Sequence, residues 1–169
     1  QPRAYVTSSA CGVCSVEVLE QSQPPSAPVH SPSWRLTATS ALQAIDDMRA
    51  QQRSFDLSGA VHAAAIANPD LEIVVVREDV GRHNAVDKVV GRCLLDDALP
   101  LTDHVLVVSG RVSYEIVAKA ISACIGTIVA VSGPTSLAVD LARAHDLVLI
   151  GFARDERMNV YSGETRVTS

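Results

Sequence analysis

Apolar positions between residues 71 and 150 alternate between strand-like and helix-like patterns. Continuous apolar runs of strand length occur at 71–76, 105–108, 128–131 and 147–150. Between them, apolar residues recur three and four positions apart, as on one face of a helix, at 85–95, 113–123 and 136–144. Strands that alternate with helices favour a largely parallel sheet covered by helices. The pattern therefore predicts an α/β domain.

The segments before and after this repeating part show patterns of their own. Residues 36–53 carry apolar residues at helical spacing with charged residues opposite, which predicts an amphipathic helix. Residues 60–66 are rich in alanine, which suits a closely packed helix with His62 near its start. Residues 158–168 predict a short hairpin that turns at Ser162 and Gly163.

The first 35 residues differ in composition from the rest. Residues 21–33 hold four of the 8 prolines, mixed with Ser and Gln, so this stretch is predicted to be an exposed connector rather than a helix. We therefore expect two parts: a cysteine loop with its connector at 1–35, and an α/β cofactor-binding domain at 36–169.

Composition limits the partners. The formal net charge is −5 and aromatic residues make up 4%, which argues against general binding to nucleic acid or an anionic membrane surface. No apolar run approaches the roughly 20 residues of a membrane helix, and no signal segment opens the chain. Four cysteines are too few for a secreted disulfide framework. We expect a cytoplasmic protein that holds anions only at a local site.

Cys11 and Cys14 form a Cys-x-x-Cys pair in the stretch TSSACGVC, residues 7–14. Such a pair supports sulfur or redox exchange, supplies half of a zinc site that His62 would extend, or is a structural pair. Zinc-dependent deamination is disfavoured, because the residue two after His62 is Ala64 rather than glutamate and the cysteine pair lies upstream.

Polar, glycine-containing segments follow the four predicted strands, at 77–84, 109–113, 132–136 and 151–154. Ligands of open α/β sheets bind at the carboxyl ends of the strands. Glycine lets backbone N–H groups approach an anion, hydroxyls donate hydrogen bonds, and arginine binds phosphate. The segments predict a site for a phosphorylated or nucleotide-like ligand, with candidate side chains Arg82, His83, Ser109, Arg111, Ser132 and Thr135.

Structural roles compete with this interpretation. Taken one at a time, hydroxyl side chains such as Thr135 are more typical of helix caps and turns than of binding sites. His83 fits a capped, ion-paired helix start as well as it fits proton transfer or ligand contact.

With these residues together, the chain resembles the formate dehydrogenase accessory sulfurtransferase family, the FdhD sulfur carriers. The matching stretches are TSSACGVC at 7–14, GAVHAA at 59–64, EDVGRHNAVDK at 78–88, SGRVSYEIV at 109–117, PTSLAV at 134–139, GFAR at 151–154 and MNVY at 158–161. They follow the family order across almost the whole chain, and 78–88 is the most specific. Ser15 and Ser58 depart from the glycines expected there.

The resemblance implies a three-layer α/β domain with a mostly parallel sheet, cytidine-deaminase-like but without zinc chemistry. It implies that sulfur from a cysteine desulfurase is carried as a persulfide, which we expect on Cys11 with Cys14 assisting. The sulfur becomes the sulfido ligand of the molybdenum or tungsten bis-guanine-dinucleotide cofactor, Mo-bis(molybdopterin guanine dinucleotide), which formate dehydrogenase needs.

The resemblance also implies the remaining features. The cofactor would be bound as a substrate near the end of the chain, and a guanine nucleotide would mimic it; the contacts fall on Phe152, Ala153, Arg154, Asp155, Glu156 and Arg157. A homodimer is expected, and the family's β-rich N-terminal segment is missing here. The alternative is a chaperone that binds the cofactor without transferring sulfur.

Overall fold

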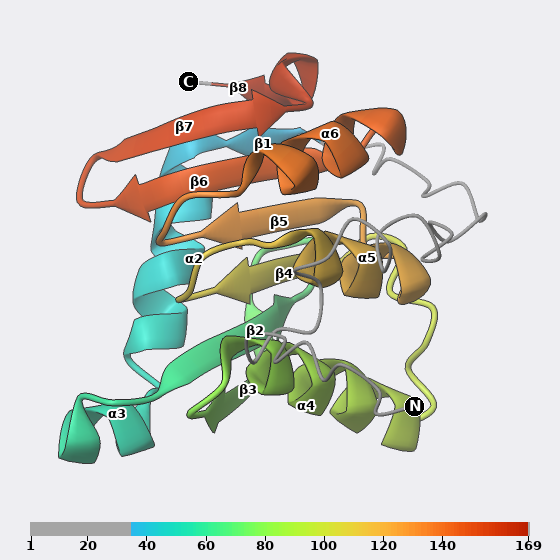
Figure 1. Ribbon diagram of the computed structural model, residues 1–169. Coiled ribbons are helices and arrows are strands. Elements are labelled where there is room, and N and C mark those ends of the chain that lie inside the picture. The colour runs from blue at the N-terminus through green and yellow to red at the C-terminus, as the bar shows by residue number, and fades with distance from the viewer. Residues whose placement is uncertain (1–34, 169) are drawn as a thin grey trace, which may run out of the picture.

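The computed structural model describes residues 35–168, so Cys11, Cys14 and the predicted connector lie outside the described residues. A six-stranded sheet in the order β3-β2-β4-β5-β6-β7 lies between two helical layers (Figure 1). Its strands are β2 His62–Ala67, β3 Ile73–Asp79, β4 Val105–Val108, β5 Thr127–Ala130, β6 Val148–Arg154 and β7 Arg157–Ser162. The helices are α2 Ala38–Arg49, α3 Arg53–Ser58, α4 Arg82–Leu95, α5 Tyr114–Ser122 and α6 Ser136–Ala144.

The sheet confirms the α/β class and is mixed in direction. β4, β5 and β6 pair in parallel, whereas β2 is antiparallel to both of its neighbours and β7 is antiparallel to β6. β3 therefore runs in the same direction as β4, β5 and β6. The carboxyl ends of these four strands lie together with the start of β2, since His62 is opposite Asp79. This side of the sheet is called the carboxyl edge below.

The prediction of a helix for the alanine-rich segment is wrong, because this segment forms strand β2. β2 lies between β3 and β4, and every residue from Ala63 to Ala67 is buried. Ala64 and Ile66 face one helical layer, and the alternate alanines face the other. Because both faces are covered, no polar positions alternate along the strand, and the pattern does not differ from that of a buried helix.

The predicted terminal hairpin is also wrong in its position. The hairpin joins β6 to β7 through Asp155 and Glu156, with Arg154 opposite Arg157. After Ser162 the chain forms the 3-10 turn η1 (Glu164–Arg166) and then β8 (Val167–Thr168), which pairs in parallel with β1 (Leu36–Thr37). β6 runs past the apolar segment that predicted it because Gly151 and Ala153 stay buried, while Phe152 between them and Arg154 after them are exposed.

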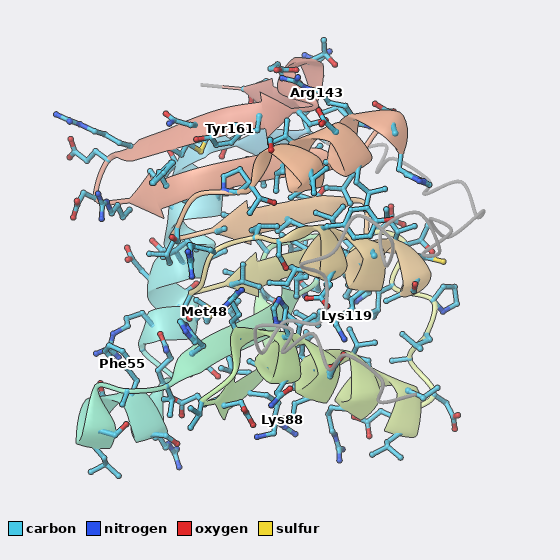
Figure 2. The ribbon with its side chains drawn as sticks, in the orientation of Figure 1. Met48, Phe55, Lys88, Lys119, Arg143 and Tyr161 are labelled. Carbon is cyan, nitrogen blue, oxygen red and sulfur yellow. The ribbon has the colours of Figure 1, made fainter. Side chains whose placement is uncertain are left out.

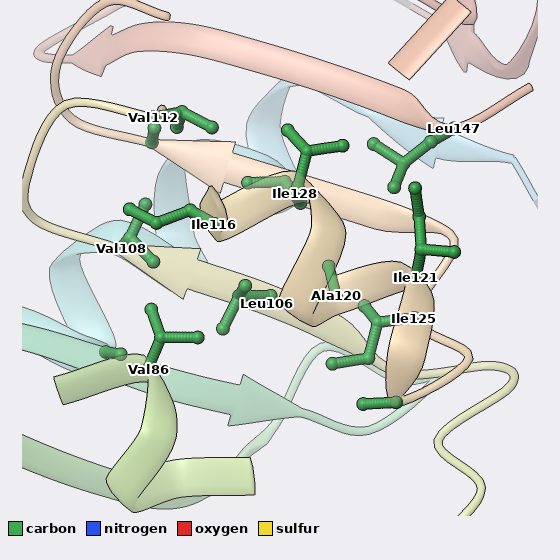
Figure 3. Close-up of a cluster of buried hydrophobic side chains, with 14 of the residues drawn as sticks. Val86, Leu106, Val108, Val112, Ile116, Ala120, Ile121, Ile125, Ile128 and Leu147 are labelled. Carbon is green, nitrogen blue, oxygen red and sulfur yellow. The ribbon is translucent and has the colours of Figure 1, made fainter. Parts of the chain in front are cut away.

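Two apolar cores hold the layers together. On one face Leu106 and Val108 of β4 belong to a cluster with residues of α4, α5 and α6. Figure 3 shows part of this cluster, with labelled side chains from α4, β4 and α5. On the other face Val105 and Val107 pack with α2. Within the described residues, no helix is both long and apolar enough to cross a membrane. The two cores fix the strand ends, and so they fix the positions of the side chains at the carboxyl edge.

Candidate functional site

Three basic side chains converge at the carboxyl edge around Gly110. A Cβ atom added to Gly110 would lie 3.1 Å from Cβ of Arg82 and 3.3 Å from Nδ1 of His62, so the missing side chain permits this approach. Nε of Arg82 is buried and has no hydrogen-bond partner among the described residues. Arg111, the next residue in the chain, is exposed. We call Arg82, Arg111 and His62 the basic cluster.

The pKa of His62 reflects the positive charges of this cluster. Its pKa is lowered from the ordinary value of 6.5, chiefly by burial and then by the charges of Arg82 and Arg111. The ring is therefore neutral at neutral pH, where it can donate one hydrogen bond and accept another. A guanidinium with an unused N–H beside an exposed arginine is suited to bind an anion.

His83 lies at the start of α4 and contacts the start of α5. Its Nε2 is 2.8 Å from Oγ of Ser113 and 3.0 Å from Oε2 of Glu115. That carboxylate oxygen is buried and makes no hydrogen bond with a described residue. A ring nitrogen carries at most one proton, so Nε2 cannot donate to both oxygens at once.

The pKa values of this pair move toward each other. Burial is the largest cause of the raised pKa of Glu115, and Asp87 adds to it against the opposing charges of Lys119 and Arg82. Burial also chiefly lowers the pKa of His83, with Arg82 and Lys119 adding and Asp87 opposing. Both groups disfavour their charged forms, so the pair is suited to hold and transfer a proton.

The acidic residues at the end of β3 are structural. The carboxylate of Glu78 accepts hydrogen bonds from the backbone N–H groups of Ser54, at 2.7 Å, and Phe55, at 2.8 Å, and so holds the start of α3. Asp79 accepts from the backbone N–H of Gly81 at 2.9 Å and from Nδ2 of Asn84 at 3.1 Å.

Lys88 completes this network from α4. It forms an ion pair with Asp79 and donates to the carbonyl of Glu78 at 3.0 Å. Lys88 and Phe55 are labelled at the lower part of Figure 2. The carboxylates of the stretch 78–88 thus make structural contacts. The same stretch contributes Arg82 and His83 to the candidate site.

The predicted hydroxyl groups are mostly engaged in local structure. Oγ of Ser109 accepts from the backbone N–H of Ala63 at 2.8 Å, which joins β2 to the end of β4. Thr135 caps α6, because its Oγ1 accepts from the backbone N–H of Ala138 at 3.3 Å. The Ser132 carbonyl accepts from the backbone N–H of Phe152 at 3.3 Å. The contacts of Ser109 and Thr135 are the competing structural roles expected for hydroxyl side chains, whereas the contact of Ser132 is made by its backbone.

The β6–β7 hairpin lies at the same edge (Figure 1). Its strands have an irregular register between Gly151 and Arg154, where Phe152 adopts a positive φ of 53°. A bulky residue in this left-handed conformation is strained. The phenyl ring, 41% exposed, covers Gly133, where an added Cβ would lie 2.6 Å from Cζ. The glycine therefore permits the far end of the ring to contact the neighbouring loop.

A hollow of about 690 Å³ lies at the hairpin, lined by Phe152, Arg154, Asp155, Glu156, Arg157, Met158 and Asn159. It contains five of the six residues predicted there by resemblance; the sixth, Ala153, is fully buried in the core against α2. Any contact of Ala153 with a ligand would therefore involve its backbone.

The structure brings Arg82, His83, Ser109 and Arg111 together beside β2 and β4, and Ser132 beside Phe152. Cys11 and Cys14 lie outside the described residues, so their positions relative to these groups stay a prediction. Sequence reasoning missed Glu115, although it falls within the stretch 109–117.

The comparisons with known proteins agree on one family. The model of the FdhD/NarQ family matches residues 1–168. The chain is similar to the sulfur carrier protein FdhD of Streptomyces coelicolor, with 48% identity over 98% of this chain and 59% of the relative. It is also similar to FdhD of Saccharolobus solfataricus, with 40% identity over 98% of this chain and 62% of the relative.

A solved structure shares the fold. A crystal structure from Desulfotalea psychrophila, provisionally named as a formate dehydrogenase accessory protein, matches with a TM-score of 0.74 and 30% identity, over 84% of this chain and 59% of the other. The chain thus spans about three fifths of the length of the curated relatives that it matches.

Proposed function

The chain belongs to the FdhD/NarQ family, and from this membership we propose that it carries sulfur for formate dehydrogenase maturation. Cys11 accepts sulfur from a cysteine desulfurase as a persulfide. The sulfur is then delivered to the molybdenum or tungsten bis-guanine-dinucleotide cofactor, which is bound as a substrate. The donor desulfurase, the client enzyme, the homodimer and the cytoplasmic location are parts of this proposal.

The observation that carries the proposal is the basic cluster. Arg82 has a buried, unpartnered Nε, Arg111 is exposed, and His62 feels both charges. The cofactor carries several phosphates, for which arginine is the preferred side chain. An overall charge of −5 gives no general attraction to anions, so the binding depends on this local arrangement.

Loading is a thiol–persulfide exchange. The Cys11 thiolate attacks the outer sulfur of the desulfurase persulfide; a sulfur–sulfur bond forms on Cys11, the donor bond breaks, and the donor cysteine leaves as a thiolate. For delivery, the Cys14 thiolate attacks the Cys11 sulfur. This step forms a Cys11–Cys14 disulfide and releases hydrosulfide, which becomes the sulfido ligand. A thiol reductant then restores both thiols.

Intact-protein mass spectrometry after incubation with a cysteine desulfurase and cysteine tests the proposal. We expect the wild type to gain the mass of one sulfur atom and Cys11→Ser to gain none, while Cys124→Ser, a matched change at a half-buried thiol, behaves as the wild type. A Cys11→Ser chain that still restores formate dehydrogenase activity would reject the assignment. A wild type that binds GDP but gains no sulfur would support the chaperone alternative.

A further inference from the structure

Two adjoining hollows lie along β3, the outer strand of the sheet. Among the described strands β3 has only β2 as a hydrogen-bonded neighbour (Figure 1). One hollow, of about 670 Å³, lies between Arg53 of α3, residues 74–77 of β3 and Arg92 of α4. The other, of about 680 Å³, continues along the strand to Glu78 and the end of α4. The hollows share Arg77 and Arg92, and we call them together the β3 groove.

The backbone of β3 presents hydrogen-bonding groups to this groove. Ala63 of β2 lies opposite Glu78, yet its N–H and its carbonyl bond to Ser109 on the β4 side. Ala63 and Glu78 are therefore a non-hydrogen-bonded pair, and the N–H and carbonyl of Glu78 point away from β2. The same holds for Val76, two residues earlier on the strand. A further strand can pair with β3 at both residues.

Basic side chains cover the carbonyl groups on this side of the strand. The carbonyl of Val76 accepts from Nη1 of Arg77 at 2.7 Å, and that of Glu78 accepts from Nζ of Lys88 at 3.0 Å. Cationic side chains on an outer strand prevent unselected pairing with other strands. A strand that brings carboxylates would be attracted to the same cations, so the charge selects the partner.

The β3 groove has an excess of positive charge, although the chain as a whole has a net charge of −5. Its charged residues are Arg53, Arg77, Lys88, Arg92, Glu78 and Asp96. Both carboxylates are engaged, that of Glu78 with backbone N–H groups of α3 and that of Asp96 with Arg92 at 2.6 Å. Arg53 and Arg77 form no ion pair with any residue that the structure describes.

The two unpaired arginines lie on opposite faces of the strand. Arg77 is two residues after Val75, which packs against the core on the α4 face, so both side chains point to that face. Arg53 begins α3, which is held by the Glu78 carboxylate on the other face. Exposed apolar side chains border the α4 face, where Leu94 is 60% exposed.

We propose that the β3 groove binds an extended acidic segment of a partner protein, which adds to β3 as an extra strand. The segment pairs with the backbone of Val76 and Glu78, and its carboxylates contact Arg77 on one face and Arg53 on the other. Its apolar side chains contact Leu94. A segment of five residues, about 16 Å long, matches residues 74–78. This surface does not depend on the proposed function.

Charge and backbone together distinguish this partner from other occupants. A second copy of the chain, paired β3 to β3, would bring the arginines of two grooves together, and like charges on paired strands repel. Free phosphate would bind the arginines but leave the backbone N–H groups of Val76 and Glu78 without a paired strand. An extended acidic segment uses both features.

Fluorescence anisotropy of labelled peptides with the 169-residue chain tests the proposal. The probe is an octapeptide of two Glu-Glu-Val-Val repeats, which presents carboxylates on both faces of a strand. One control replaces glutamate with lysine. The other methylates the backbone nitrogens of the valines, which keeps the charge and removes hydrogen-bond donors. We expect the probe to bind about tenfold or more tightly than either control.

Arginine variants connect the binding to the groove. Arg77→Gln should weaken binding of the probe about tenfold, because a charged hydrogen bond is lost. Arg53→Gln, at an exposed position where the fold is not affected, should also weaken it. Arg35→Gln, a matched change at an exposed arginine that precedes β1, should bind the probe as the wild type does. In the wild type the bound probe should slow amide exchange at Val76 and Glu78.

Four results would overturn the proposal. A wild type that does not bind the probe removes the groove as a docking site. Equal affinity for the probe and its methylated form would leave charge attraction without strand addition. Equal affinity in Arg77→Gln, Arg53→Gln and the wild type would place the binding elsewhere. Sedimentation that shows self-association, lost in Arg77→Gln and competing with the probe, would make a second copy the occupant.

Discussion

Asp79 on β3 and Glu115 on α5 are similarly shielded from solvent and yet behave in opposite ways. Their side chains are 19% and 23% exposed. The pKa of Asp79 falls to about 2, with Lys88 as the largest cause and Gly81 and Asn84 as further donors. The pKa of Glu115 rises, because burial is not offset by a hydrogen bond. Partners rather than exposure therefore decide which carboxylate stabilises the fold.

The same difference divides the polar groups at the carboxyl edge into those that hold the fold together and those that remain free to bind a ligand or a proton. The carboxylates of Glu78 and Asp79 already accept hydrogen bonds that hold α3 and α4, so they are not available to bind a ligand. Glu115 and Arg82 are shielded but retain an unused acceptor and an unused donor, respectively. Unused polar groups in a shielded position are costly, and they occur where a ligand or a transferred proton will satisfy them.

The largest effect on stability is expected for Glu78→Ala. The change leaves the backbone N–H groups of Ser54 and Phe55 without their acceptor and should lower the free energy of unfolding by about 1–2 kcal/mol. Chemical denaturation measures this loss.

Glu72→Ala is the matched control. Glu72 is an exposed carboxylate near the start of the same strand, where it accepts a hydrogen bond from Nδ2 of Asn68 at 3.0 Å. Its removal should change stability by less than about 0.5 kcal/mol. Equal losses in the two variants would contradict the structural role given to Glu78.

A smaller, pH-dependent loss is expected for Asp79→Asn. The folded pKa lies below the ordinary value of 3.8, so the ionised form favours folding. That contribution is fully present above pH 3.8 and is lost as the pH falls toward about 2. The variant should therefore be less stable than the wild type at neutral pH and approach it in strong acid. Denaturation curves with the same separation at every pH would count against this role.

The smallest effect, of opposite sign, is expected for Glu115→Gln. Because the folded pKa is raised above 4.5, the wild type loses stability as the pH rises through that window. The neutral amide removes this loss, so the variant should be more stable than the wild type at neutral pH and match it in acid.

The charged groups that act on Glu115 and His83 are Arg82 and Asp87 from α4 and Lys119 from α5, and all three remain in this variant. NMR titration of His83 gives a second measurement, since the removal of a nearby carboxylate should lower its pKa further. An unchanged His83 titration would show that the two groups are not coupled.

Sequence patterns predicted the fold where one face of an element was polar or where an apolar run was short and bounded. They found β4 and α6 at their observed positions but took β2 for a helix, because a strand buried on both faces shows no alternation. The last hairpin was misplaced because a glycine after Ser162 suggested a turn that the chain makes at Asp155.

The site was predicted in part. Arg82, His83 and Arg111 follow strand ends, where residue type and position both indicate binding. Glu115 could not be selected, because its distinguishing feature is a buried carboxylate oxygen without a hydrogen-bond partner among the described residues, which only the structure shows. The roles of Ser109 and Thr135 also required the structure, since a hydroxyl that caps a helix and one that meets a ligand look alike in sequence.

The reversed direction of β2 has a consequence for how the molecule would respond to an occupant. It brings His62 beside Arg82 and Arg111, so segments from distant parts of the chain share one small area. A ligand that contacts all of these segments would link them across the carboxyl edge of the sheet. Its binding would add to the free energy of global unfolding, and amide exchange that requires global unfolding would slow even in strands that it never touches.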